Sequence, residues 1–196
     1  MDLYEDVSRI AGITVSLHVW PPDASRCAEL FPHARISAQV GADLGARLDH
    51  ATTRALDELG GPVLVVGGDH PNLPAGWVTA CFAAARTGAV GWIPTDDGGF
   101  AAMALDRARP ELFADVPWST PGVANAVRRN AARSGARLVA PGTWYDVDDR
   151  DDLARLVRDL ERGASCPHTR RVLATLGGTS VSTSGFTPQG PQEESS

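Results

Sequence analysis

The sequence contains no lysine. All 18 of its basic residues are arginine, and 24 acidic residues give the chain a formal net charge of −6. A chain of this charge does not offer the basic surface that nucleic acids or anionic membranes require, so we expect neither as a partner. The absence of lysine also excludes a lysine Schiff base and leaves phosphate binding to arginine, backbone N–H groups or a metal ion.

Cysteine and long apolar runs are scarce as well. The three cysteines, Cys27, Cys81 and Cys166, lie far apart and form no paired motif, which is typical of a reducing compartment. No apolar run approaches the ~20 residues that span a bilayer. The N-terminus also lacks the basic and apolar regions of a signal peptide. We therefore expect a cytoplasmic protein.

The chain alternates between segments with strand character and segments with helical periodicity, which predicts a three-layer α/β fold with a mainly parallel sheet. We expect one domain over residues 1–176 and a disordered tail, 177–196, rich in Ser, Thr, Gly, Pro and Gln. The segment 100–105 suits either a strand or a helix. The other expected strands are 13–20, 34–38, 63–66, 89–94 and 137–140, and the expected helices are 2–10, 23–31, 43–59, 74–86, 120–134, 149–162 and 168–176.

The stretch 61–74, GPVLVVGGDHPNLP, is the centre of this pattern. Its four apolar residues, Val63–Val66, are bracketed by Gly-Pro and Gly-Gly and are typical of a strand buried on both faces of a sheet. Asp69 follows at the carboxyl end of that strand, where open α/β sheets bind ligands. Its carboxylate either holds a divalent cation beside the phosphates of a nucleotide or caps the following turn.

Two further acidic segments precede helices or turns. In 146–152 we expect Asp149 to cap a helix and the aspartates after it to complement the helix dipole. Asp146 and Asp148 come before that helix, and one of them is a candidate for the second carboxylate of a metal site. In 95–100, TDDGGF, the glycines permit either an ordinary turn or a close approach of the backbone to a ligand.

Five segments, taken in order, resemble bacterial glycosyltransferases of the arsenosugar-biosynthesis type. These have the GT-A fold of nucleotide-diphospho-sugar transferases and are related to the nucleotidyltransferases. The resemblance spans residues 12–160, and its segments are QVGADLGARL (39–48), GGDHPNLP (67–74), PTDDGGF (94–100), ARPELFADVPWSTPGV (108–123) and WYDVDDRDDL (144–153).

The resemblance implies a metal-dependent glycosyl or nucleotidyl transferase in a biosynthetic pathway. It would use a nucleotide-activated donor, expected to be a sugar, and a small-molecule acceptor. In such enzymes catalysis rests on positioning and electrostatics. The implied residues are Asp69 and Asp148 as ligands of Mg2+ or Mn2+, Asp69 and Asp97 as catalytic residues, Gln39, Gly41 and Arg47 near the base and ribose, and Gly98 and Gly99 in the loop facing the sugar or acceptor.

The sequence also departs from this family. Its members begin with a strand and a loop rich in Gly, Lys and Arg that wraps the phosphates, and this sequence starts after that point, as a truncated member or one with an upstream start. The missing strand would leave an open sheet edge beside 63–66, which we expect a homodimer to cover. The alternative function is therefore a degenerate or repurposed member without nucleotide binding, serving as a partner subunit or acting on another small molecule.

Overall fold

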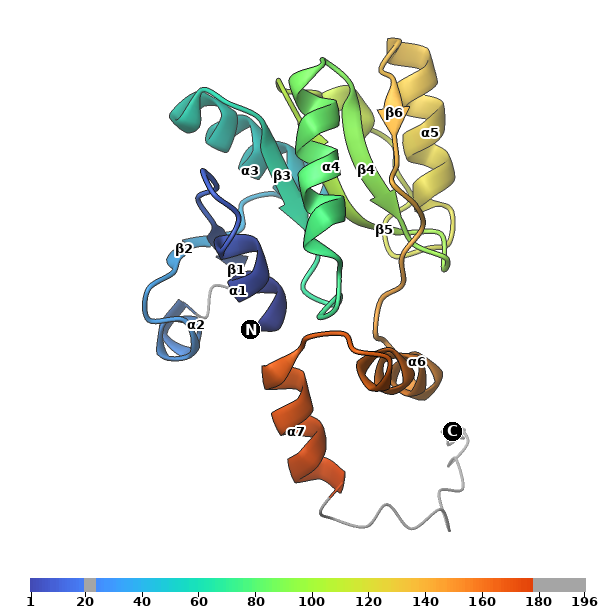
Figure 1. Cartoon of the computed structure of the whole chain (residues 1–196). Helices are drawn as coiled ribbons and strands as arrows, with labels where there is room; N and C mark the ends of the chain where they lie inside the picture. The colour runs from blue at the N-terminus through green and yellow to red at the C-terminus, as the bar shows by residue number, and fades with distance from the viewer. Residues whose placement is uncertain (20–23, 178–196) are drawn as a thin grey trace, which may run out of the picture.

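The computed structural model describes residues 1–19 and 24–177. The expected strand stop at Pro21 and the expected tail beyond Gly177 lie outside the described residues. Figure 1 shows the chain. Its helices are α1 (Asp2–Ser8), α2 (Ala24–Leu30), α3 (Leu44–Leu59), α4 (Ala75–Arg86), α5 (Val123–Ser134), α6 (Arg150–Glu161) and α7 (Pro167–Gly177), with a 3-10 turn η1 (Pro110–Leu112), and its strands are β1 (Ser16–Val19), β2 (Arg35–Ala38), β3 (Val63–Val66), β4 (Val90–Pro94), β5 (Phe100–Leu105) and β6 (Leu138–Val139).

Four of the strands form one mixed sheet in the order β3-β5-β4-β6. β5 pairs antiparallel with both of its neighbours, whereas β4 and β6 pair in parallel. Consequently β3, β4 and β6 share one direction and β5 runs against them. β1 and β2 form a separate parallel pair. The α/β class is confirmed. The segment 100–105, which suited either a helix or a strand, forms the strand β5.

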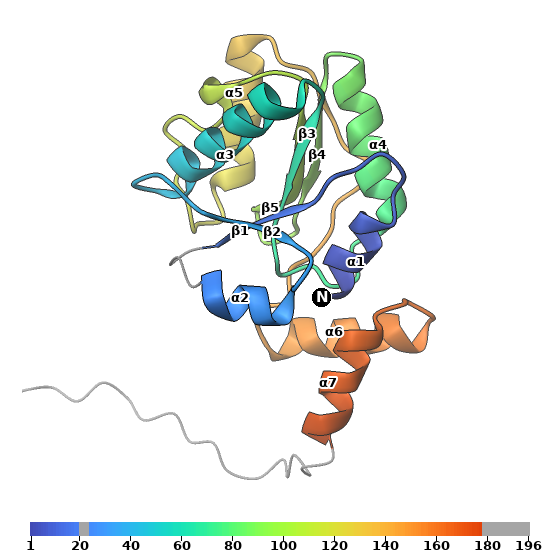
Figure 2. The ribbon, with the colours of Figure 1, turned by 90° about the vertical axis from the view of Figure 1, so that its left-hand side faces the viewer.

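The four-stranded sheet lies between two helical layers, with α4 and α1 on one side and α3 and α5 on the other (Figures 1 and 2). The alternation of side chains along each strand divides the core in the same way. In β5, Met103 packs toward α5, while Ala102 and Ala104 pack toward α4. A Cβ at Gly91 of β4 would lie 2.5 Å from the Cα of Cys81, so glycine and alanine together let α4 approach the sheet closely.

β3 is the last strand of this sheet, and no strand among the described residues pairs with its outer edge. Its four residues are only half buried, whereas all five residues of β4 are buried. The prediction that Val63–Val66 is buried on both faces is therefore wrong, because in the described part of the chain β3 has a neighbouring strand on one side only. The Gly67 N–H donates to the Ala101 carbonyl at 2.9 Å. Since hydrogen-bonding direction alternates along an antiparallel strand, Leu64 and Val66 direct their N–H and C=O groups to the open edge. The expected open edge is therefore present.

The two ends of the described chain are joined by a buried carboxylate. Asp2 of α1 is 4% exposed. It accepts hydrogen bonds from the backbone N–H groups of His168 (2.9 Å) and Thr169 (2.8 Å) and from the Thr169 hydroxyl (2.6 Å). Glu5 lies 2.6 Å from the His168 ring. Asp2 therefore caps α7 and fixes it against α1.

Candidate active site

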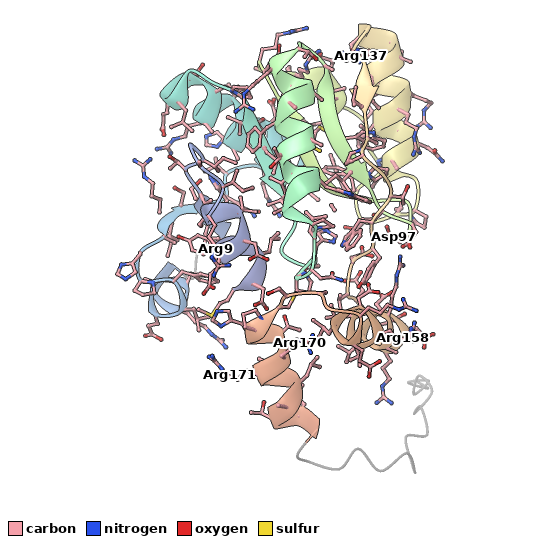
Figure 3. The ribbon with its side chains drawn as sticks, viewed as in Figure 1. Arg9, Asp97, Arg137, Arg158, Arg170 and Arg171 are labelled. Atoms are coloured by element: carbon pink, nitrogen blue, oxygen red, sulfur yellow. The ribbon has the colours of Figure 1, made fainter. Side chains whose placement is uncertain are left out.

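β3 and β4 run in the same direction, so their carboxyl ends lie at the same end of the sheet. The segment 144–148 passes both of these strand ends. The Trp144 N–H donates to the Pro94 carbonyl at 2.9 Å, which continues the edge of β4. Three residues further on, the Val147 N–H donates to the Asp69 carbonyl at 3.1 Å. These bonds bring Asp146 and Asp148 beside Asp69, near the end of β4, where Figure 3 labels Asp97.

Asp69 and Asp148 carry carboxylates that the protein leaves free. Both side chains are accessible to solvent, and no group in residues 1–19 or 24–177 donates a hydrogen bond to either carboxylate or pairs with it. The alternative that Asp69 caps the turn after it is therefore not what the structure shows. Asp149 is different: it accepts from the N–H groups of Asp151 and Asp152 and caps α6, as predicted.

Asp146 is the partly buried member of this group of aspartates. Burial raises the pKa of the Asp146 carboxyl above its usual value, and the neighbouring carboxylates of Asp97 and Asp148 raise it further. A hydrogen bond from the backbone N–H of Asp146 and the charge of His70 act in the opposite direction. Carboxylates from two connected segments thus concentrate negative charge at the sheet edge. A bound cation would relieve that repulsion.

The loop that carries Asp97 is held by its own residues. One carboxylate oxygen of Asp97 accepts from the Thr95 hydroxyl at 2.5 Å and from the Gly99 N–H at 2.9 Å. Gly98 has a φ of +96°, and a Cβ there would overlap the Pro121 carbonyl. Glycine at position 98 therefore lets this loop pack closely against the start of α5. The Ala124 N–H of α5 donates to the Gly98 carbonyl at 2.7 Å.

Gln39, Gly41 and Arg47 lie in and beside the connection from β2 to α3. The Gln39 amide donates to the His18 carbonyl at 3.0 Å, which ties this connection to β1. The Arg47 guanidinium donates to the Gly41 carbonyl at 3.3 Å, and a Cβ at Gly41 would lie 2.6 Å from the Arg47 backbone nitrogen. Asp43 caps α3 by accepting from the Ala46 N–H. These residues form a tight turn before α3.

Sequence reasoning missed a hydrogen-bonded network behind the aspartates. His70 is 3% exposed, and its Nδ1 lies 2.9 Å from the Tyr145 carbonyl, so this nitrogen carries a proton and donates. The Tyr145 hydroxyl donates to Asp159 at 2.7 Å and accepts from the Asn72 amide at 2.6 Å. Burial and Asp159 raise the pKa of Tyr145 to about 12. No local pattern joins residues so far apart in sequence.

The donor set suits a magnesium or manganese ion whose shell is completed from outside the protein. Among the described residues, no group of three or more His, Cys, Asp or Glu side chains could hold a metal. Mg2+ commonly takes one or two carboxylates, with water and substrate phosphate oxygens as its other ligands. The free carboxylates of Asp69 and Asp148 have the ligand chemistry that such an ion takes.

Comparison with protein-family profiles identifies the family of this chain. The profile of a family described as uncharacterized proteins conserved in bacteria, DUF2064, matches residues 4–120. The chain belongs to this family. The DUF2064 match includes Asp69 and Asp97 and ends before α5. A comparison with curated proteins finds no match.

Solved structures show the fold of this DUF2064 chain. A Desulfovibrio desulfuricans G20 protein, provisionally named a nucleotide-diphospho-sugar transferase, is similar with a TM-score of 0.76 at 23% identity, over 89% of this chain and 80% of that one. A 4-diphosphocytidyl-2C-methyl-D-erythritol synthase gives 0.55 at 17% identity, over 81% and 86%. A CMP:2-keto-3-deoxy-manno-octonic acid synthetase complexed with CTP gives 0.54 at 13% identity, over 82% and 86%. The predicted GT-A-like fold is confirmed. No helix in the described part of the chain is long and apolar enough to cross a membrane.

Proposed function

We propose that this protein is a metal-dependent transferase of the glycosyl or nucleotidyl type that acts in the cytoplasm on a nucleotide-activated donor, a sugar nucleotide by preference, and a small-molecule acceptor. The fold shared with nucleotide-diphospho-sugar transferases supports the class of reaction. The arsenosugar-type resemblance of the sequence motifs favours glycosyl transfer. In this proposal Mg2+ or Mn2+ is the cofactor.

The observation that carries the proposal is the pair of free carboxylates of Asp69, after β3, and Asp148, in the segment before α6. Asp69 and Asp148 have no protein partner among the described residues, and the Val147–Asp69 backbone bond holds their segments together. Repulsion among the carboxylates of Asp146, Asp97 and Asp148 raises the free energy of the site without a cation. These carboxylates stabilise a bound cation for the same reason.

The residues of the chain would act mainly by position and charge. Asp69 and Asp148 would hold the metal, which neutralises charge on the leaving phosphate group when it is bound. Asp97, fixed by Thr95 and Gly99, would use its second carboxylate oxygen to orient the sugar or acceptor hydroxyl at the same edge. Such positioning lowers the activation free energy without covalent chemistry by the protein.

The proposal is tested by calorimetric titration of the full chain with UDP, GDP, CTP, UDP-glucose and GDP-mannose, each with and without Mn2+. We expect one of these nucleotides to bind with a Kd below about 1 mM in the presence of Mn2+ and at least about tenfold more weakly without it. Absence of binding by every nucleotide at about 1 mM, with or without Mn2+, would overturn the proposal.

The open edge of β3 favours a second candidate, in which the protein is a subunit of an assembly and no longer binds nucleotide. Leu64 and Val66 offer unpaired backbone groups there, and exposed, uncharged edges pair readily with another strand. A homodimer formed through two β3 edges would satisfy those groups. Light scattering should then report a dimer. Val66→Pro removes one edge N–H and spares the bonds to β5, so it should give a folded monomer whose circular dichroism spectrum matches that of the parent. A monomeric parent protein contradicts this assembly.

A further inference from the structure

A cavity lies beneath the candidate active site, between α6, the loop that precedes α4 and the 144–145 segment. Its volume is about 770 Å3. None of the four aspartates of the candidate active site lines it. We call it the α6 cavity, and the polar and aromatic side chains that matter for its chemistry are Asn72, Trp144, Tyr145, Arg155, Arg158 and Arg162.

Three arginines of the α6 cavity come from one side of α6 and its C-terminal end. Arg155 and Arg158 lie on the helix and Arg162 is its C-cap residue, and their spacing of i, i+3 and i+7 places them within about a sixth of the helix circumference. Leu156 and Leu160 are buried on the neighbouring side of α6. They pack with Val147 and with Leu173 of α7 and so hold α6 in place. Figure 3 shows Arg158 on α6, below the edge of the sheet where Asp97 lies. The arginine stripe therefore faces the cavity because the leucines fix the rotation of the helix.

The acidic residues near this stripe do not neutralise it. Asp6 and Asp159 also line the cavity, and Asp6 pairs with Arg9 of its own helix at 2.8 Å. Arg155 pairs with Asp96 at 2.5 Å and lies over the Tyr145 ring at 3.8 Å. Asp159, 3.6 Å from Arg162, already accepts the Tyr145 hydroxyl proton at 2.7 Å. Within residues 1–19 and 24–177, the Arg158 guanidinium has no hydrogen-bond or ion-pair partner. A protein with a net charge of −6 thus keeps unpaired positive charge at this cavity.

The inner wall of the cavity contains two further polar atoms without partners. Asn72 Oδ1 and Trp144 Nε1 are buried and form no hydrogen bond in the described part of the chain. Buried groups left in this state destabilise the folded protein. After a small movement of the Asn72 or Trp144 side chain, the polar atoms of a bound ligand could form the missing hydrogen bonds with these two atoms.

From this arrangement we propose that the α6 cavity binds a small molecule bearing a phosphate or carboxylate group. Arg158 and Arg162 hold the oxyanion, because a guanidinium presents paired N–H donors that match either group. Arg155 and the Tyr145 ring form the adjoining wall. The volume is that of a site for a whole metabolite, so a sugar phosphate fits better than inorganic phosphate. This inference does not depend on the proposed transferase function.

The test is calorimetric titration of the full chain, at constant ionic strength, with inorganic phosphate, glucose 6-phosphate and gluconate. We expect saturable binding of glucose 6-phosphate with a Kd of about 0.1–1 mM, and weaker binding of inorganic phosphate. Binding of gluconate with equal affinity would identify a carboxylate as the natural group, and binding of the phosphates alone would identify a phosphate; both support the site.

Variants of exposed arginines separate a built site from general attraction to positive charge. The double variant Arg158→Gln/Arg162→Gln should weaken binding at least about tenfold, whereas Arg171→Gln on α7, outside the cavity, should leave the Kd within about twofold. Arg158→Lys/Arg162→Lys keeps both charges, loses the guanidinium fork and should weaken binding several-fold. The proposal is overturned if no probe saturates by about 10 mM, if both double variants bind as the parent does, or if Arg171→Gln weakens binding as much as the double variants.

Discussion

Replacing Gly98 by alanine tests how the Asp97 loop is built. The φ of +96° at Gly98 is a conformation that costs an L residue about 1–2 kcal/mol. The added Cβ would also overlap the Pro121 carbonyl oxygen and lie 2.8 Å from its carbon. Overpacking of this kind costs about 1–3 kcal/mol, because the start of α5 must move. Gly98→Ala should therefore lower the free energy of unfolding by about 2–5 kcal/mol.

Two other glycines separate these contributions. Gly135 has a φ of +70°, and a Cβ added there would meet nothing within 4 Å, so Gly135→Ala should cost only about 1–2 kcal/mol. Gly76 lies inside α4 with open space around it, and Gly76→Ala should stabilise the protein by about 1 kcal/mol. Urea unfolding followed by circular dichroism measures all three. A Gly98→Ala protein as stable as Gly135→Ala would show that Pro121 does not lie against Gly98.

Three more predictions concern the hydrogen bonds that hold the frame of the site. Burial raises the pKa of the Asp2 carboxyl, but the hydrogen bonds from Thr169 and His168 outweigh burial and bring this pKa below the usual 3.8. The stability that Asp2 contributes is therefore present above pH 3.8 and is lost as the pH falls through the lower pKa of the folded state. Asp2→Asn should lower the unfolding free energy at pH 7 by about 1–3 kcal/mol and flatten its loss in that acid range, which urea titrations at several pH values can measure. Asp149→Ala removes the α6 cap and should cost about 1 kcal/mol in the same assay; an unchanged midpoint would contradict the cap. Tyr145→Phe leaves Asp159 and Asn72 without a shared partner and should cost about 1–3 kcal/mol, so a stability equal to that of the parent would argue against the network.

Local features of the fold could be predicted from the sequence. Val63–Val66 forms a strand because an apolar, β-branched run between glycines has few other stable conformations. Asp149 caps α6 because its side chain reaches N–H groups only two and three residues ahead. Features of this kind depend on neighbours in sequence. The residues themselves are therefore sufficient to indicate them.

Features that depend on distant residues could not be predicted. The alanines of β5 suit either a helix or a strand, and the space between β3 and β4 decides the outcome. The glycine at position 98 indicated a turn, but not that Pro121 would fill the space its missing Cβ leaves. Tyr145 and Asn72 are 73 residues apart, and only the folded chain brings them together. The α6 cavity belongs to the same class of feature.

Binding of Mn2+ tests the central claim, that Asp69 and Asp148 form a metal site at the edge of the sheet. Electron paramagnetic resonance of free Mn2+, titrated with the full chain in the presence of UDP or GDP, measures this binding directly. We expect one bound ion per chain, with an affinity at least about tenfold lower in Asp69→Asn and in Asp148→Asn. Asp57→Asn, on an exposed part of α3, should bind as the parent does. Equal affinity in the parent protein and all three variants, or no Mn2+ binding by the parent, would contradict the account.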